Sequence, residues 1–231
     1  MNGQPKGRLI AIEAGDGSGK ATQTKMLCER LLADGYRAHR VEFPDYGSDS
    51  SALVRMYLNG QFGDKAAEVN AYAASTFFAV DRYASYKLKW EKYYTAGDII
   101  LADRYTTSNM AHQAIKITPK AEREKFISWL CDLEFNKFKL PQPDLVIFLD
   151  MEPAVSDKLI AARADAGTKK KDIHERDTDY LHLCHAIYQE LAADLKWERI
   201  ECSQKNEPLA PEEVHNKVYS AVKSKLLSLR P

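Results

Sequence analysis

The chain of 231 residues lacks paired cysteines and long apolar runs. Its four cysteines, Cys28, Cys131, Cys184 and Cys202, lie far apart and form no CxxC pair, as is typical of proteins in a reducing compartment. No stretch approaches the roughly 18 apolar residues of a membrane span, and the opening MNGQPKGR contains no apolar run. We therefore predict a cytoplasmic protein that does not enter a membrane.

An excess of charge of either sign is also lacking, since 33 Lys and Arg residues balance 33 Asp and Glu residues. Without a global field, the chain has no general attraction for nucleic acid or for an anionic membrane surface. Any phosphate site must therefore be local. The length predicts one domain spanning residues 1–231.

Short apolar, β-branched runs alternate with segments of helical length. The runs span residues 8–13, 37–43, 98–102, 144–149 and 197–202. Several are apolar almost throughout, which is typical of parallel strands covered on both faces. The pattern predicts an α/β fold with a doubly wound five-stranded parallel sheet flanked by helices. A long helical stretch, 65–96, has apolar positions on more than one stripe, and we expect it to be central and buried.

A glycine-rich turn follows the first predicted strand and precedes a predicted helix that ends at Gly35. In such a turn, backbone N–H groups converge on phosphate oxygens and the helix N-terminus adds partial positive charge. Lys20 is placed to reach the β- and γ-phosphates of a nucleoside triphosphate. The residues predicted to bind the ATP phosphates are Gly15, Asp16, Gly17, Ser18, Gly19, Lys20, Ala21 and Thr22.

This turn departs twice from the strict phosphate-loop pattern G-x-x-x-x-G-K-[ST]. Ala14 replaces the first glycine. Gly15 and Gly17 can compensate for this loss because both give the backbone of the turn conformational freedom. Ala21 replaces the hydroxyl residue that usually binds Mg²⁺. Thr22 is the nearest substitute as a metal ligand.

A second polar cluster, Asp103-Arg104, stands at the carboxyl end of the third predicted strand. In a doubly wound sheet this edge faces the ligand crevice. A carboxylate beside an arginine at that edge can hold metal, phosphate or both, although a purely structural ion pair is the alternative. Asp103 is therefore the second candidate metal ligand.

Residues 103–113 match a known sequence signature at every defined position except His112. The signature consists of an acidic residue, Arg, an aromatic residue, any two residues, Ser, a small residue, any one residue, Ala, an aromatic residue and often Gln. Three further stretches, 43–45, 78–82 and 140–150, agree in order with the same family. The chain resembles the thymidylate kinase family over nearly its whole length. The resemblance implies a P-loop nucleoside monophosphate kinase fold and transfer of the γ-phosphoryl of ATP to dTMP, with Mg²⁺ as cofactor.

The same resemblance implies roles for individual residues. Phe78 would stack on the thymine ring, Arg82 would bond an exocyclic oxygen of the base, and Arg104 would hold the phosphate of dTMP. These residue types suit the roles, since a ring face stacks well and an arginine fork matches phosphate or carbonyl oxygens. The predicted dTMP-binding residues are Asp45, Phe78, Arg82, Arg104, Ser108, Asn109, His112 and Gln113.

The chain departs from the family at two positions of the acceptor site. His112 stands where family members carry an aromatic residue that crowds the deoxyribose. Tyr46 follows Asp45 where eukaryotic-type members carry an arginine for the acceptor phosphate. Arg55, on the next predicted helix, is a candidate replacement.

Phosphoryl transfer needs positive charge at the transferred group. Family members carry the arginine in the phosphate loop or in a lid over ATP, and here Gly17 and Ser18 follow Asp16 in the loop. We therefore predict a mobile lid at 162–177, with Lys169, Lys170 and Lys171 as alternative donors; a solvated loop is the other interpretation. The predicted catalytic residues are Asp16, Lys20, Asp103, Arg104, Arg163 and Arg176.

Other functions stay open from the sequence. A deoxynucleoside kinase would need a carboxylate base after the second strand, for which Glu42 and Asp45 are candidates. Ala21 alone encourages a non-catalytic nucleotide-binding protein, whereas the balanced charge argues against a nucleic-acid-dependent ATPase. The resemblance also implies a homodimer packed through long helices, with 65–96 as a candidate.

Overall fold

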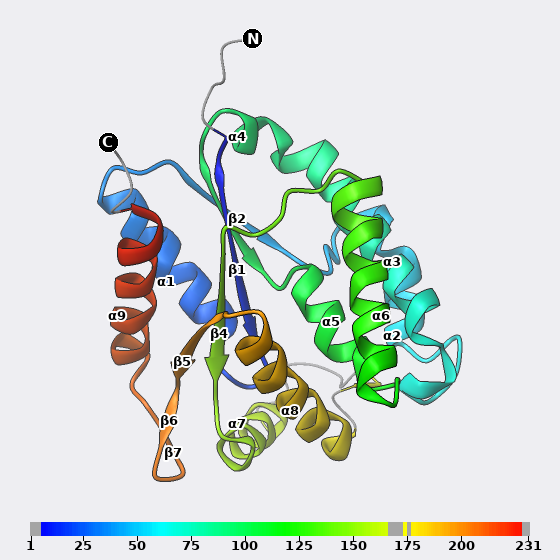
Figure 1. Cartoon of the computed structure of the whole chain (residues 1–231). Helices are drawn as coiled ribbons and strands as arrows, with labels where there is room; N and C mark the ends of the chain where they lie inside the picture. Colours follow the sequence, from blue (N-terminus) through cyan, green and yellow to red (C-terminus); the bar gives the residue numbers. More distant parts are fainter. Residues whose placement is uncertain (1–5, 166–172, 175–176, 228–231) are drawn as a thin grey trace.

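The computed structural model of the chain describes residues 6–165, 173–174 and 177–227. Its centre is a five-stranded sheet in the order β2-β3-β1-β4-β5, and every neighbouring pair is parallel (Figure 1). The strands are β1 (Arg8–Ala14), β2 (Ala38–Glu42), β3 (Ile99–Asp103), β4 (Leu145–Asp150) and β5 (Glu198–Glu201). The predicted doubly wound five-stranded parallel sheet is confirmed.

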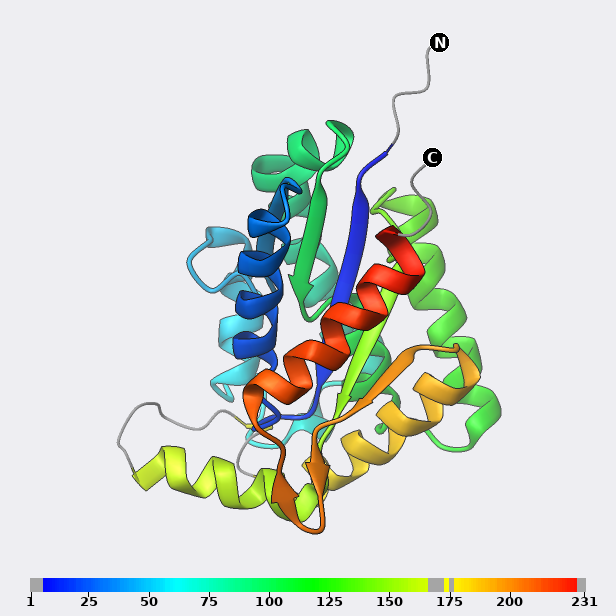
Figure 2. The same ribbon diagram turned by 90° about the vertical axis from the view of Figure 1, so that its left-hand side faces the viewer.

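Helices cover both faces of this sheet. On one face lie α1 (Lys20–Ala33) and α9 (Pro211–Val222), which pack side by side (Figure 2). The opposite face carries α3 (Ala71–Ser85), α5 (Thr106–Ala114), α6 (Lys120–Cys131) and α8 (Thr178–Asp194). The remaining helices are α2 (Ala52–Leu58), α4 (Glu91–Thr95) and α7 (Pro153–Asp165).

The strand sequences produce two cores because successive side chains of a strand point to opposite faces. In β1, Ile10 and Ile12 pack in the core that Leu27 of α1 and Val218 of α9 complete. Leu9 belongs to the core on the other face. Burial on both faces explains why the strand runs are apolar almost throughout.

The predicted continuous helix at 65–96 is interrupted in the structure. Asn70 caps α3, with its Oδ1 accepting a hydrogen bond from the Ala73 amide at 2.9 Å, so the helix begins at Ala71. A π-helical turn, Tyr86–Trp90, then separates α3 from α4. Helical propensity alone does not indicate where a capping residue or a π-helical turn will occur. The prediction of one helix was therefore wrong at its start and at the π-helical turn.

The expected burial of this stretch is also corrected. The inner face of α3 buries Ala74 and Phe78. Tyr72, Val80 and Tyr83 on its outer face are 43%, 47% and 42% exposed. The apolar positions outside the inner stripe therefore form an exposed surface and not a second buried one.

Two smaller features complete the fold. A hairpin of β6 (Ser203–Gln204) and β7 (Glu207–Pro208), which the sequence patterns do not predict, follows β5. After this hairpin, α9 is followed by a π-helical turn, Lys223–Leu227. Within the described residues, no helix has the length and apolar character needed to cross a membrane.

Candidate active site

The carboxyl ends of three strands meet at one edge of the sheet. Cα pairing places Asp103 of β3 opposite Ile12 of β1 on one side and opposite Glu42 of β2 on the other. The glycine-rich turn follows β1 at this same edge, and α1 begins at Lys20. The two motifs found in the sequence are therefore neighbours in space.

Backbone geometry makes the glycine-rich turn a cradle. Gly17 and Gly19 have φ values of +82° and +77°, in the left-handed region that favours glycine. A Cβ on Gly17 would lie 2.8 Å from the Ser156 Oγ of α7. The Ser18 hydroxyl donates to the Gly15 carbonyl at 2.9 Å and closes the turn. This loop at the N-terminus of α1 suits the phosphates of a nucleotide.

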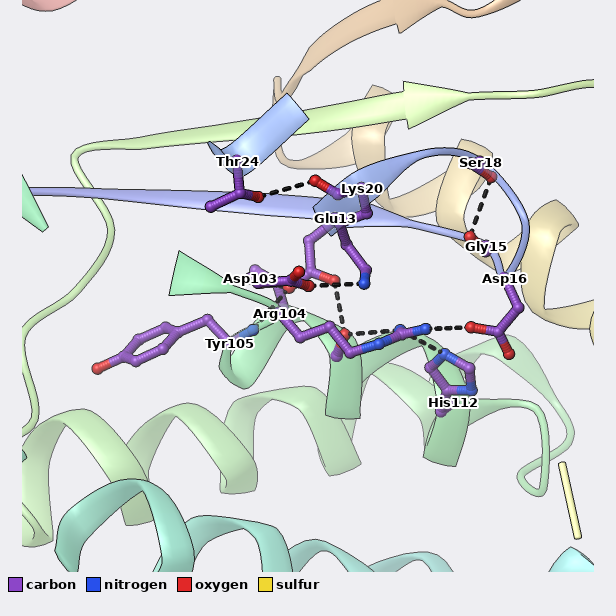
Figure 3. Close-up of polar contacts among 12 residues, drawn as sticks. Glu13, Gly15, Asp16, Ser18, Lys20, Thr24, Asp103, Arg104, Tyr105 and His112 are labelled. Carbon is purple, nitrogen blue, oxygen red and sulfur yellow. Dashed lines mark hydrogen bonds and ion pairs between the residues drawn. The ribbon is translucent and has the colours of Figure 1, made fainter. Parts of the chain in front are cut away.

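Lys20 and Asp103 form an ion pair across this edge of the sheet. The Lys20 Nζ donates to the Asp103 Oδ1 at 2.6 Å, and both side chains are mostly buried (Figure 3). Burial and the neighbouring Arg104 lower the pKa of Lys20, although Asp103 acts in the opposite direction. The pair holds the ammonium group at the start of α1, where a phosphate would lie.

Arg104 is the centre of a buried hydrogen-bond network. Its φ of +67° lies in the left-handed region, a costly conformation for a residue other than glycine that is often found at functional sites. The Nη2 donates to the Asp16 Oδ1 at 2.5 Å. The Nη1 donates to the His112 Nε2 at 3.0 Å, to the Ser108 Oγ at 3.2 Å and to the Tyr188 hydroxyl at 3.3 Å.

The charges of this network follow from burial and from one another. Burial would raise the pKa of Asp16, but the positive charges of Arg104 and Lys20 outweigh it and lower the pKa. Burial and the neighbouring Arg104 hold the pKa of His112 well below its usual range, so its imidazole is neutral. The network therefore presents a charged arginine fork steadied by one carboxylate and one neutral imidazole.

Glu13 is a site residue that the motif analysis missed. It is fully buried in β1 and accepts hydrogen bonds from the Tyr105 amide at 2.9 Å, the Thr107 hydroxyl at 2.5 Å and the Ser108 hydroxyl at 2.6 Å. The Tyr188 hydroxyl donates to it at 3.1 Å. It thus ties the start of α5 to the strand that carries the phosphate loop. A carboxylate inside an apolar strand directly before the glycines is the signal that could have revealed it.

A cavity of about 240 Å³ joins the two motifs. Asp16, Lys20 and Asp103 line one part of it, next to the phosphate loop. All the predicted dTMP residues except Asp45 also line it: Phe78, Arg82, Arg104, Ser108, Asn109, His112 and Gln113. We call this the acceptor cavity.

Gln113 in the wall of the acceptor cavity has unused hydrogen-bonding capacity. Its side chain is fully buried, and neither its Nε2 nor its Oε1 has a hydrogen-bond partner among the described residues. Leaving a buried amide unpaired is costly. A ligand that offers both a donor and an acceptor would remove this cost.

Arg82 is held by a buried carboxylate that the sequence did not indicate. Its Nε and Nη2 donate to the two carboxylate oxygens of Glu134 at 2.7 and 2.5 Å, and both side chains are almost completely buried. The Thr106 hydroxyl donates to the same carboxylate at 2.7 Å. Glu134 does not engage the third nitrogen, Nη1, and Arg82 lines the acceptor cavity.

Asp45 lies outside the acceptor cavity. It lines a neighbouring cavity of about 660 Å³ and forms an ion pair with Lys89. Its backbone N–H donates to the Asp81 Oδ2 at 2.8 Å. These contacts hold the loop after β2, whereas Glu42 lines both cavities.

Arg55 and Thr22 are likewise not brought into the acceptor cavity. The Arg55 guanidinium donates to the carbonyls of Tyr46 at 3.1 Å and Ser48 at 2.9 Å, so it braces the loop and does not line the cavity. Thr22 is exposed on the first turn of α1 and lines neither cavity. Spacing alone had made Thr22 a metal candidate, but the helix turns its side chain outward.

The residues present fit Mg²⁺ only as a partial site. Asp103 offers a carboxylate at the phosphate loop, but no group of three His, Cys, Asp or Glu side chains with metal-ligand geometry occurs in the described part of the chain. Mg²⁺ commonly uses one or two carboxylates together with substrate phosphates and water. The donor set therefore suits an ion that arrives with a nucleotide.

The predicted lid falls mostly outside the described residues. The side chain of Arg163, the whole of Arg176, and Lys169, Lys170 and Lys171 are not among them. Ile173 and His174 are described, and both are buried. The Ile173 amide donates to the Leu58 carbonyl at 3.2 Å, and His174 lines the acceptor cavity, which no sequence pattern indicated.

Comparisons with known proteins agree with this geometry. The family model for thymidylate kinase matches residues 12–218. A thymidylate kinase of Mycobacterium tuberculosis is 34% identical over 188 residues, which are 80% of this chain and 86% of the relative. A thymidylate kinase of Schizosaccharomyces pombe is 27% identical over 225 residues, or 96% of this chain and 94% of the relative.

A solved structure matches as well. The thymidylate kinase of Candida albicans superposes with a TM-score of 0.70 at 20% identity, covering 96% of this chain and 93% of its own. At this identity the likeness concerns the fold, and it confirms the predicted nucleoside monophosphate kinase architecture. Together with the family match over most of the sequence, the findings lead to one conclusion: the chain belongs to the thymidylate kinase family.

Proposed function

We propose that the chain transfers the γ-phosphoryl group of ATP to dTMP, giving dTDP and ADP. One observation carries the proposal: a single cavity joins the phosphate loop and Lys20 to Arg104 and Gln113. Phosphoryl transfer consists largely of alignment and charge neutralisation. A cavity with a donor phosphate site at one end and an acceptor site at the other meets both needs.

The chain's own groups supply alignment and charge. The backbone of the phosphate loop binds the β- and γ-phosphates, and Lys20 lies beside them. Arg104 grips the acceptor phosphate with its planar fork, which Asp16 and His112 keep in place. The attacking phosphate oxygen is thereby held in line with the γ-phosphoryl group.

The base end of the cavity suits thymine. Phe78 offers a ring face for stacking, and Arg82, fixed by Glu134, offers Nη1 to an exocyclic oxygen. Thymine presents an N–H beside carbonyl oxygens, and the unpaired amide of Gln113 can match both kinds of group. Ser108, Asn109 and His112 complete the wall between base and phosphate.

Mg²⁺ would be held at Asp103 together with the ATP phosphates, and it would neutralise charge developing on the transferred group. Arg163 and Arg176 stay the predicted donors of the remaining positive charge, and 162–177 stays the predicted lid. The alanine at position 21, in place of the usual hydroxyl residue, does not remove this site. Asp103 and the phosphates provide oxygen ligands without a hydroxyl on α1.

A direct test separates the proposed function from its two alternatives. Initial rates of ADP formation are compared with dTMP and with thymidine as acceptors. We expect turnover with dTMP, because Arg104 requires a phosphate to grip. Turnover with thymidine alone would make Glu42, which lines the cavity, the base of a deoxynucleoside kinase. Nucleotide binding without turnover of either acceptor would indicate a non-catalytic protein.

We further propose a homodimer, located in the cytoplasm, that pairs through the outer face of α3. Tyr72, Val80 and Tyr83 give this face an exposed apolar surface, and such surfaces commonly mark interfaces. Tyr72 also stacks edge-on against Trp129 of α6 at 4.7 Å, which extends the surface to a second helix.

Charge on this surface should break the dimer. We expect Val80→Lys to elute as a monomer in size-exclusion chromatography with light scattering, because a buried lysine without a partner is costly at an apolar interface. Leu88→Lys, at an exposed position beyond α3, is the matched control and should stay dimeric. A wild-type protein that is monomeric at high concentration would refute the homodimer.

A further inference from the structure

A chain of buried hydrogen bonds runs from Lys116 to the wall of the acceptor cavity. The Lys116 Nζ donates to the Tyr57 hydroxyl at 3.0 Å, and that hydroxyl lies 3.0 Å from the Nε2 of His174. His174 lines the cavity, whereas Lys116 and Tyr57 do not. Tyr57 and His174 are buried, and Lys116 is half-buried.

The direction of these hydrogen bonds follows from their chemistry. A lysine ammonium group can only donate, so the Tyr57 oxygen accepts from Lys116. We assign the Tyr57 hydroxyl hydrogen to the Nε2 of His174 at 3.0 Å, because the Ala66 carbonyl is farther away at 3.4 Å. An Nε2 that accepts carries no hydrogen. In its neutral form, the His174 ring therefore holds its proton on Nδ1.

His174 in turn contacts the residues that steady Arg104. Its ring stacks on His112 with centroids 5.6 Å apart and on Tyr180 with centroids 4.7 Å apart. His112 accepts from the Arg104 Nη1 at 3.0 Å. The position and tautomer of His174 thus bear on the part of the cavity that faces the acceptor phosphate and sugar.

We propose that Lys116 is a positioning residue of the acceptor cavity, which acts through the Tyr57 hydroxyl to fix the place and the tautomer of His174. The inference rests on the proposed function for its kinetic consequence, but its structural part does not depend on the substrate. Lys116 itself touches no substrate. Its second hydrogen bond, to the Val69 carbonyl at 2.9 Å, anchors it to the loop before α3.

The arrangement predicts a dependence on pH. Lys116 faces Tyr57 of α2, His174 and Cys184 of α8, and burial lowers its pKa to about 8. Burial also raises the pKa of Cys184 to about 12 and lowers that of His174 to about 3, so both stay neutral as Lys116 titrates. Above about pH 8 the neutral amine becomes an acceptor, and the Tyr57 hydroxyl can turn from His174 to Lys116.

Kinetics with dTMP and ATP varied separately test the proposal. We expect Lys116→Met and Tyr57→Phe each to raise the KM for dTMP by about tenfold, the equivalent of one lost hydrogen bond, with kcat and the KM for ATP unchanged. Wild-type KM for dTMP should rise above about pH 8, and Lys116→Arg should abolish this rise because arginine stays charged. Lys120→Met, which removes two surface ion pairs between α6 and α8, with Glu190 and Asp194, is the control.

A second readout needs no substrate. The ¹⁵N shifts of histidine-labelled protein report which imidazole nitrogen carries the proton, and His174→Gln assigns the signal. We expect the Nδ1-protonated form in the wild type and a changed tautomer population in Tyr57→Phe. Unchanged tautomers together with wild-type KM values in folded variants would overturn the role of Lys116. Absence of dTMP turnover with the expected tautomer would overturn the proposed function instead.

Discussion

Replacing Arg104 by methionine is expected to lower kcat/KM for dTMP by about 10³-fold, the loss typical of removing one preorganised charged donor from an active site. The side chain contacts Asp16, Ser108, His112 and Tyr188 and lines the acceptor cavity, where the proposed function places the acceptor phosphate. Methionine has a similar length but neither charge nor N–H groups. The KM for ATP should change much less, because Lys20 and the glycine backbone of the phosphate loop are not replaced.

The lysine variant provides the matched control. Arg104→Lys keeps the charge but loses the planar fork that reaches Asp16 and His112 at once, so we expect activity between wild type and the methionine variant. Steady-state kinetics with each substrate varied in turn measure the effect. If Arg104→Met retained the wild-type kcat/KM for dTMP, Arg104 would not be the acceptor phosphate ligand.

Arg82→Met should destabilise the fold by about 3–5 kcal/mol, because it leaves the Glu134 carboxylate buried without its cation. Thr106 alone would then donate to that carboxylate. Urea unfolding should show a lower midpoint with an unchanged slope. The double variant Arg82→Met, Glu134→Leu should recover most of the loss, since an apolar pair of similar volume needs no compensation.

A surface pair serves as the comparison for this prediction. Lys87→Met removes the exposed pair with Glu91, for which we expect a change below about 1 kcal/mol. If Arg82→Met had an effect as small as Lys87→Met, Glu134 would have to be protonated or solvated in the native state. The buried pair would then contribute no more to stability than the exposed pair.

The parts of the site that could be predicted are local in sequence. The phosphate loop lies within one turn, and Arg104, Ser108, Asn109 and Gln113 fall at fixed steps along one strand end and helix. Strands that are buried on both faces are also plainly apolar, which is why the sheet was predicted correctly. In a doubly wound sheet, ligands bind at the carboxyl ends of the strands. The phosphate loop and the Asp103-Arg104 motif could therefore be assigned to one site from the sequence.

The parts that were missed are contacts between distant segments. Glu134 meets Arg82 from 52 residues away, and His174 meets Tyr57 from 117 residues away. Neither pairing has a spacing that a sequence pattern could reveal. Asp45 stands in a family motif, but the structure places it in an ion pair with Lys89 beside the neighbouring cavity, so its predicted contact with dTMP stays a prediction.

Under the proposed function, the acceptor cavity selects dTMP as the acceptor of the γ-phosphoryl group of ATP. Initial rates of ADP formation with dTMP, dUMP, dCMP, dGMP and no acceptor, each with Mg²⁺ and with chelator, test it most directly. We expect rapid, Mg²⁺-dependent turnover with dTMP, and slow or no turnover with dCMP, dGMP or no acceptor. Equal rates across the panel, or no rate with dTMP above the rate without acceptor, would contradict it.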